Sequence, residues 1–275
     1  MPYVPDGRPL LRQAFEGRYA MPAFNVSSLE MARACIEAAE AESAPVILQT
    51  YPGDLEQASP AVFAATVRTL AEEASVPVML HLDHGDGLER AVACLRAGYG
   101  SVMFDGAELP LEENIAATRL VSRVAHAAGA AAEAAAGSFG VGEGGDDGVR
   151  LTEPGVAARL LHESGADMVA CSVGSRHGQP SKLDLTRLEA IAGAVRAPLV
   201  LHGGSGIPER DLARATELGV VKVNIGAALF RALLGAWRDV APTAALHYDV
   251  LPKAREAVRA VAREKIRWMR VHVGR

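Results

Sequence analysis

Short apolar runs alternate with longer amphipathic stretches along most of the chain. The apolar runs are rich in Val, Ile, Leu and Met, and they lack the polar alternation of strands that have one face in water. This pattern is typical of parallel strands that are buried on both faces. We expect strands at Ala20–Val26, Val46–Thr50, Val78–Asp83, Ser101–Phe104, Ala130–Ala135, Met168–Val173, Leu199–His202 and Val221–Ile225.

The stretches between these strands predict helices, because several of them open with Pro or follow Ser or Asp. Strand and helix units repeated eight times favour a closed (β/α)₈ TIM barrel over an open doubly wound sheet of about five or six strands. We expect one barrel domain over residues 1–275, with a C-terminal helical extension from about Arg231. The expected barrel helices include Ser28–Ser43, Pro60–Ala74, Gly87–Ala97, Pro110–Ala128, Pro154–Ser164 and Pro208–Leu218.

Composition and charge narrow the possible functions. The 275 residues are 49% hydrophobic and 22% charged, which is an ordinary globular balance. A formal net charge of −5 argues against nucleic acid or an anionic membrane surface as a partner. No apolar run is long enough to cross a bilayer, and the first residues resemble no signal peptide. We therefore expect a cytoplasmic protein whose thiols, Cys35, Cys94 and Cys171, are buried and reduced.

Histidines lie where three of the expected strands end. The active site of a (β/α)₈ barrel lies at the carboxyl ends of its strands, and His84, His177 and His202 each fall at or just past such an end. Any one of them alone is more typical of a hydrogen-bonded loop residue. Three together favour a catalytic zinc site, which takes three protein ligands and keeps one position open. His81 faces the other way along its strand and is expected to be packed.

Three further features lie near these histidines. Asp83 either transfers protons to a metal-bound substrate or orients a ligand histidine. The segment from His202 to Pro208 reads His-Gly-Gly-Ser-Gly-Ile-Pro and has the form of an anion cradle, because glycines let backbone N–H groups approach a phosphate. The glycine-rich segment 137–148 is either a linker or, as we favour, a mobile loop over the site.

Six motifs carry a resemblance to a known family, and the match is nearly collinear from Met21 to about Phe230. They are Pro22-Ala23-Phe24-Asn25-Val26, His81-Leu82-Asp83-His84, Met103-Phe104-Asp105-Gly106, Gly174-Ser175-Arg176-His177-Gly178, Leu201-His202-Gly203-Gly204-Ser205-Gly206 and Val221-Lys222-Val223-Asn224. Together they resemble the class II, zinc-dependent ketose-bisphosphate aldolases, which act on fructose or tagatose bisphosphates. The resemblance implies one Zn²⁺ per chain, bound by His84, His177 and His202, in a homodimer or homotetramer.

The resemblance also implies roles for the residues around the metal. Asp83 would give the proton to the aldehyde-derived hydroxyl, and Glu143 on the glycine-rich loop would act on the carbon acid. Asp105 and Glu133 would form a second metal site or support the first. The implied substrate contacts are Asn25, Gln49, Gly178, Gly203, Ser205, Asn224 and Ala227.

The chemistry implied is reversible aldol cleavage of a sugar phosphate through a zinc-stabilised enediolate. Zinc polarises the ketone carbonyl, so that no Schiff-base lysine is needed. Lys222 is the alternative for such a covalent role. The same enediolate would also serve a metal-dependent epimerase or isomerase. A non-catalytic accessory subunit is the third alternative, although such a barrel has no need of a metal site.

The sequence departs from the family mainly where phosphate would bind. Ala135 replaces a second acidic residue, and Asn224-Ile225-Gly226-Ala227 lacks the usual hydroxyl donor. The segment 178–184 is short, and no basic residue of the C-terminal stretch matches the family's far-phosphate ligand. Arg176 is either a new anion contact or a solvated loop residue. We therefore expect a substrate that has diverged from fructose or tagatose 1,6-bisphosphate.

Overall fold

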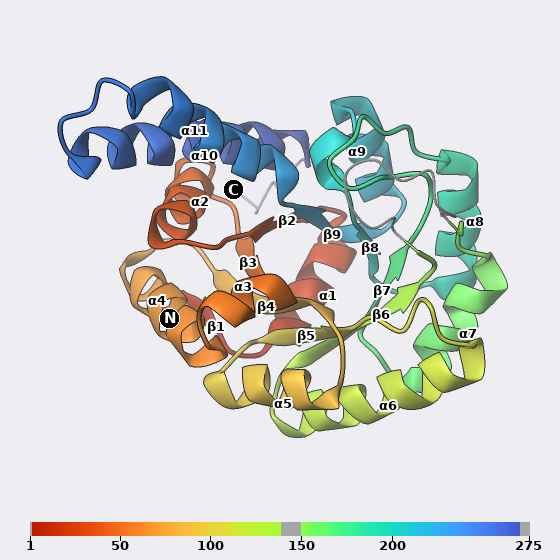
Figure 1. The fold of residues 1–275 in the computed structure, drawn as a ribbon. Helices are drawn as coiled ribbons and strands as arrows, with labels where there is room; N and C mark the ends of the chain where they lie inside the picture. The colour runs from red at the N-terminus through yellow and green to blue at the C-terminus, as the bar shows by residue number, and fades with distance from the viewer. Residues whose placement is uncertain (1, 139–149, 270–275) are drawn as a thin grey trace.

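Eight parallel strands close into a barrel in the computed structural model, which describes residues 2–138 and 150–269 (Figure 1). Each strand pairs with the next, and the last pairs with the first through Met21 and Lys222, so that the ring closes. The expected (β/α)₈ barrel is confirmed. Its strands are β2 (Met21–Asn25), β3 (Val46–Thr50), β4 (Val78–Gly85), β5 (Ser101–Phe104), β6 (Ala131–Ala136), β7 (Met168–Cys171), β8 (Leu199–Leu201) and β9 (Val220–Ile225).

Helices surround the strands, as Figure 1 shows. The six expected barrel helices are present, and their ends agree with the expected ones to within two residues. They are α2 (Leu29–Ala41), α4 (Pro60–Glu73), α5 (Leu88–Ala97), α6 (Leu111–Ala127), α7 (Pro154–Ser164) and α9 (Glu209–Glu217). The helices α3 (Pro52–Gln57) and α8 (Leu185–Val195) and the 3₁₀ turn η1 (Gly204–Gly206) were not among the predicted elements.

The amino-terminal residues form a short element that the sequence analysis did not predict. Strand β1 (Tyr3–Val4) pairs with the start of β4, and helix α1 (Gly7–Gly17) follows it. The backbone N–H of Gly7 donates to the carbonyl of Gly100, which precedes β5. The first helix therefore lies at the amino-terminal end of the strands, which leaves their carboxyl ends open.

Two long helices follow the last strand. Helix α10 (Ala227–Val240) begins directly after Gly226, four residues before the predicted start of the extension, and α11 (His247–Trp268) packs against α10 and α2. Figure 1 shows these two helices together along one side of the barrel, beside α2. The extra C-terminal helices expected from the sequence are thus confirmed.

The barrel strands are buried on both faces, as their apolar composition predicts. Every residue of the eight strands is buried except His84. Strand β6 is the least typical, because alanine favours strands weakly and five of its six residues are Ala. Its backbone is paired on both sides, with β5 and β7. All three cysteines are buried free thiols, as expected. In the described part of the chain, no helix is long and apolar enough to cross a membrane.

Candidate active site

An irregularity at the end of β4 brings two adjacent side chains to the same site. Neighbouring residues of a regular strand point to opposite faces. Here the register with β5 shifts between Leu82 and Gly85, and His84 adopts a left-handed backbone conformation with φ of 51°. A side chain at Gly85 would collide with the carbonyl of Met103, so this bend requires glycine. As a result Asp83 and His84 both line the cavity at the carboxyl end of the barrel.

The three predicted histidines converge at this end of the barrel. His84 lies at the end of β4, His177 in the loop after β7, and His202 directly after β8. Nε2 of His84 lies 3.0 Å from Nδ1 of His202, and the His177 ring centroid is 5.6 Å from that of His84. One nitrogen from each ring falls within 4.8 Å of the others. Among the residues described, no other group of His, Cys, Asp or Glu has this arrangement.

Carboxylates orient two of these rings. Nδ1 of His84 donates to Oδ2 of Asp105 at 2.5 Å, and Nε2 of His202 lies 3.1 Å from Oε1 of Glu133. These contacts leave Nε2 of His84 and Nδ1 of His202 as the nitrogens that face each other. Asp105 and Glu133 thus stand where carboxylates stand when they orient metal-binding histidines. Three imidazoles with such partners are a donor set that fits zinc.

The charges around the histidines differ from ring to ring. Burial would lower the pKa of His84, but Asp83 and Asp105 outweigh it and raise that pKa above its ordinary value. Burial also lowers the pKa of His202, well below the ordinary value, so this ring is neutral at neutral pH. A neutral ring is the form that binds a metal. A metal ion therefore competes with a proton for His84, because the raised pKa favours the protonated ring.

Asp83 is held by three side-chain amides. Its Oδ2 accepts hydrogen bonds from Asn25 at 2.8 Å and from Gln49 at 3.0 Å, and its Oδ1 accepts one from Asn224 at 2.7 Å. Burial would raise the pKa of Asp83, but the neighbouring His84, other nearby positive charges and the bond from Asn25 lower it. The carboxylate is therefore ionised at neutral pH. Gln49, expected to contact substrate, is fully buried and lies behind Asp83 rather than on the cavity wall.

A buried ion pair lies beneath the site. Nζ of Lys222 is 3.0 Å from Oε2 of Glu133 and donates to Oδ1 of Asn224 at 2.6 Å, and both charged side chains are fully buried. The bond from Lys222 fixes which end of the Asn224 amide faces Asp83. Lys222 is not on the cavity wall, which argues against a covalent role for it. His81 is packed here as expected, with Nε2 3.5 Å from Glu133.

The cavity around these residues has a volume of about 990 Å³, which suits a small-molecule ligand. Nearly all the predicted site residues line it or support its wall, apart from Glu143, which lies outside the described residues. Arg176 is exposed and is not on the wall. Sequence analysis missed several wall residues, although Tyr51 and Asp86 directly follow strands and could have been found by position. The missed residues are Tyr51, Pro52, Asp54, Asp86, Ala107, Glu108, Ser138, Gly226 and Phe230.

The predicted anion cradle lies at one end of this cavity. Gly178, Gly203 and Ser205 line it, and Gly203 has a φ of 69°, which favours glycine. Two cations from the C-terminal helices border the cradle. Arg231 on α10 donates to the carbonyl of Gly178 at 3.2 Å, and Lys265 on α11 donates to that of Ser205 at 3.3 Å.

Lys265 has a second contact that connects the cradle to the end of α11. Its Nζ lies 3.9 Å from the ring centroid of Trp268, which is within the range of a cation–π interaction. Arg231 and Lys265 thus supply positive charge near a cradle in which the sequence suggested a loss of phosphate contacts. No motif marks either residue, because they lie 26 and 60 positions from Ser205 and come close to it only through folding.

Comparison with known proteins agrees with this geometry. Residues 6–272 match the family model "Fructose-bisphosphate aldolase class-II". A fructose-bisphosphate aldolase of Streptococcus pyogenes serotype M1 is 40% identical over 84% of this chain and 81% of its own length. One from Staphylococcus aureus strain Mu50 is 35% identical over 97% of each chain.

Solved structures agree as well. The YdjI aldolase of Escherichia coli K12 superposes with a TM-score of 0.87 at 31% identity, over 98% of each chain. A putative fructose-1,6-bisphosphate aldolase from Coccidioides immitis gives a TM-score of 0.85 at 30% identity, over 95% of this chain and 94% of that one. With the histidine cluster and Asp83 in place, the family match over nearly the whole length settles the assignment: the chain belongs to the class II fructose-bisphosphate aldolase family.

Proposed function

We propose that this class II aldolase holds one zinc ion at His84, His177 and His202 and reversibly cleaves a phosphorylated ketose. The observation that carries the proposal is the position of the ionised Asp83 carboxylate beside three converging histidines, on the wall of a cavity of about 990 Å³. A bound zinc would polarise the ketone carbonyl and stabilise the enediolate of the ketone half. No Schiff base is needed.

Asp83 provides the proton transfer. In the cleavage direction its carboxylate accepts the proton of the hydroxyl group that becomes the aldehyde, and in condensation it returns that proton. The amides of Asn25 and Asn224 hold the two carboxylate oxygens in place. Because these amides also line the cavity, they can contact the ketone half of the substrate. A role for Glu143 at the carbon acid stays a prediction from the family resemblance.

The cradle binds the phosphate of the ketone half in this proposal. Backbone groups at Gly178 and Gly203 and the start of α10 surround it, and Arg231 and Lys265 add charge. A helix N-terminus and backbone N–H groups together favour an anion. The family's zinc dependence, the sugar-phosphate substrate and the cradle are thus consistent with one another. A homodimer or homotetramer in the cytoplasm stays a prediction.

Metal analysis tests the proposal directly. We expect about one zinc per chain by elemental analysis, and loss of that zinc in His177→Ala. The matched control is His162→Ala, which removes an exposed histidine from α7 and should leave the zinc in place. Absence of metal in the wild type, even after zinc is supplied, would overturn the proposal.

Asp83→Asn separates aldol cleavage from enolisation. The variant should retain zinc and should still exchange the carbon-bound proton of dihydroxyacetone phosphate with solvent, while cleavage is lost. An epimerase or isomerase would instead convert a ketose phosphate into its isomer without producing an aldehyde. Product analysis by NMR distinguishes these outcomes.

A further inference from the structure

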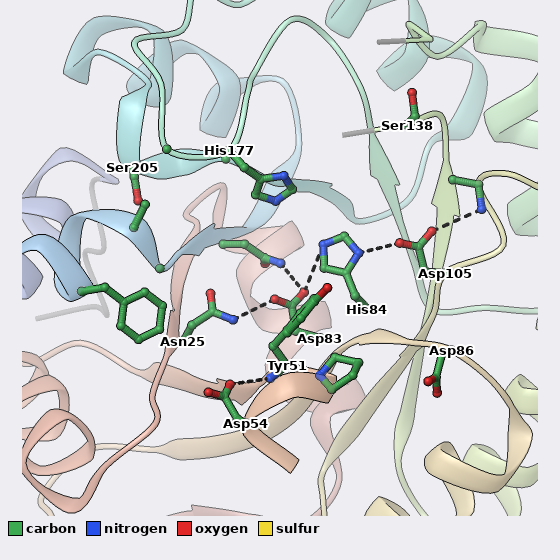
Figure 2. A pocket seen from close by; sticks show the side chains of 18 of the residues that line it. Asn25, Tyr51, Asp54, Asp83, His84, Asp86, Asp105, Ser138, His177 and Ser205 are labelled. Atoms are coloured by element: carbon green, nitrogen blue, oxygen red, sulfur yellow. Dashed lines mark hydrogen bonds and ion pairs between the residues drawn. The ribbon is translucent and has the colours of Figure 1, made fainter. Parts of the chain in front are cut away.

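The charged groups of the cavity are divided between its two ends. Figure 2 shows Ser205 and His177 toward one side and Asp86 and Asp105 toward the other, with Asp83 and His84 between them. The cations described above, Arg231 and Lys265, both contact the Ser205 end. In the described part of the chain, this end therefore combines positive charge with a cradle of backbone groups.

The opposite end is acidic. Asp86 and Asp105 lie there in Figure 2, and Glu108, three residues after Asp105, also lines the cavity. Asp54 lines another side of the cavity, below Asn25 in Figure 2, and accepts a hydrogen bond from the backbone N–H of Tyr51 at 2.9 Å. No Lys or Arg lines the cavity among residues 2–138 and 150–269. The sequence of residues 139–149 contains no Lys or Arg either.

Two arginines near this end are already paired. Arg90 donates to both carboxylate oxygens of Asp86 at 2.7 and 2.9 Å, and Arg150 donates to Glu108 at 2.9 Å and to the carbonyl of Ala107 at 2.9 Å. A phosphate dianion at this end would have to compete with those carboxylates for each arginine. It would also face the carboxylate of Asp105, which lies at the same end.

Given the proposed function, we propose that the substrate is a ketose monophosphate whose aldehyde half carries no phosphate. The single phosphate lies on the ketone half, at the cradle. Hydroxyl groups of the aldehyde half donate to Asp86 and Glu108, because carboxylates are strong acceptors and such bonds are charge-assisted. Like charges placed together across a binding site discriminate strongly against the wrong ligand. The acidic end thus excludes a phosphorylated aldehyde.

The reaction balances without any further reactant. Asp83 accepts the hydroxyl proton at C4, the C3–C4 bond breaks, and its electron pair passes to the ketone half as the enediolate. A proton is then added at C3 and Asp83 releases its own. The products are a phosphorylated hydroxyketone and a neutral hydroxyaldehyde.

Condensation kinetics on the complete zinc-loaded protein test this proposal. The donor is dihydroxyacetone phosphate, and the acceptors are D- and L-glyceraldehyde and their 3-phosphates. In at least one configuration, we expect kcat/KM for the unphosphorylated aldehyde to exceed that of its 3-phosphate by about tenfold or more. Equal or faster use of the 3-phosphates would overturn the proposal. The complete chain is used so that residues 270–275, which include Arg270 and Arg275, take part.

Charge-changing substitutions test whether the acidic end of the cavity sets the preference between aldehydes. Asp86→Lys should raise kcat/KM for glyceraldehyde 3-phosphate at least about fivefold and lower that for glyceraldehyde, because it removes an acceptor for the hydroxyl groups of the unphosphorylated aldehyde. Glu16→Lys makes the same charge change at an exposed position on α1 and should alter neither. Arg231→Ala should raise the KM for dihydroxyacetone phosphate without changing the preference between aldehydes. If Asp86→Lys has no effect on the 3-phosphate, the acidic end does not set the specificity.

Direct binding gives a readout that does not depend on turnover. Calorimetry on zinc-loaded Asp83→Asn should show tighter binding of fructose 1-phosphate than of fructose 6-phosphate, and the reverse order would contradict the proposal. Solvent exchange of the carbon-bound proton of dihydroxyacetone phosphate distinguishes failure of this inference from failure of the proposed function. Exchange combined with preference for phosphorylated aldehydes refutes only this inference, whereas absence of both exchange and zinc refutes the proposed function and this inference with it.

Discussion

Removal of the buried lysine beneath the site should strongly lower the free energy of unfolding. Replacement of both partners of its ion pair should lower it less. Lys222 and Glu133 are fully buried, with Nζ and Oε2 3.0 Å apart. In Lys222→Met the Glu133 carboxylate keeps its burial but loses its cation. Removal of one partner from a buried pair typically destabilises by about 3–5 kcal/mol. Against a total stability of about 5–15 kcal/mol, this is a large fraction.

The double variant shows how much of the destabilisation comes from the unpaired charge of Glu133 and how much from loss of the ion pair itself. Lys222→Met with Glu133→Gln removes both charges, so it should be at least about 2 kcal/mol more stable than Lys222→Met alone. Urea unfolding of zinc-free protein, followed by circular dichroism, measures the free energy of unfolding of both variants. The control Lys182→Met removes an exposed lysine and should change stability by less than about 0.5 kcal/mol. A loss below about 1 kcal/mol in Lys222→Met, or strict additivity in the double variant, would refute the reasoning.

Three further predictions concern the catalytic carboxylate, the metal site and an ion pair of Glu42. Asp83→Asn should lower kcat for cleavage by about 10²–10⁴-fold with zinc content unchanged, measured by steady-state kinetics and elemental analysis. Zinc at about 1,000 times its Kd should stabilise the wild type by about 4 kcal/mol, seen as a higher Tm, and His177→Ala should show no such shift. Hydrogen bonds from Arg267 and Arg263 lower the pKa of Glu42. A carboxyl group whose pKa is lowered by folding stabilises the fold above its unfolded pKa, and this contribution is lost as the pH falls through the folded pKa. Glu42→Gln should therefore be less stable than wild type at pH 7 in urea unfolding, and the difference should shrink as the pH is lowered below the ordinary carboxyl pKa.

The sequence predicted the parts of the site that depend on strand order. In a closed parallel barrel all strands end at one face, so three histidines at strand ends must come close together whatever their separation along the chain. The buried strands were recognisable because their runs are apolar without alternation, as in Val46–Thr50, which agrees with β3 at both ends. These inferences needed only periodicity and position.

Other features depend on backbone detail that a residue pattern does not contain. Regular alternation would turn Asp83 and His84 to opposite faces, and only the register shift and the left-handed His84 bring both to the cavity. Gln49 also follows the strand-end rule, yet its amide reaches Asp83 and not the cavity. The cations Arg231 and Lys265 were missed because helix packing, rather than any motif, brings them to the cradle.

The stacking of Lys265 on Trp268 gives the protein an intrinsic optical probe. The chain has only two tryptophans, and the other, Trp237, is 38% exposed on α10. The emission of an indole depends on the charge next to its ring, and Lys265 contacts both this ring and the cradle. In a Trp237→Phe background, titration with inorganic phosphate should therefore change the fluorescence of Trp268 in step with occupancy, so that ligand affinity can be followed without any label or turnover.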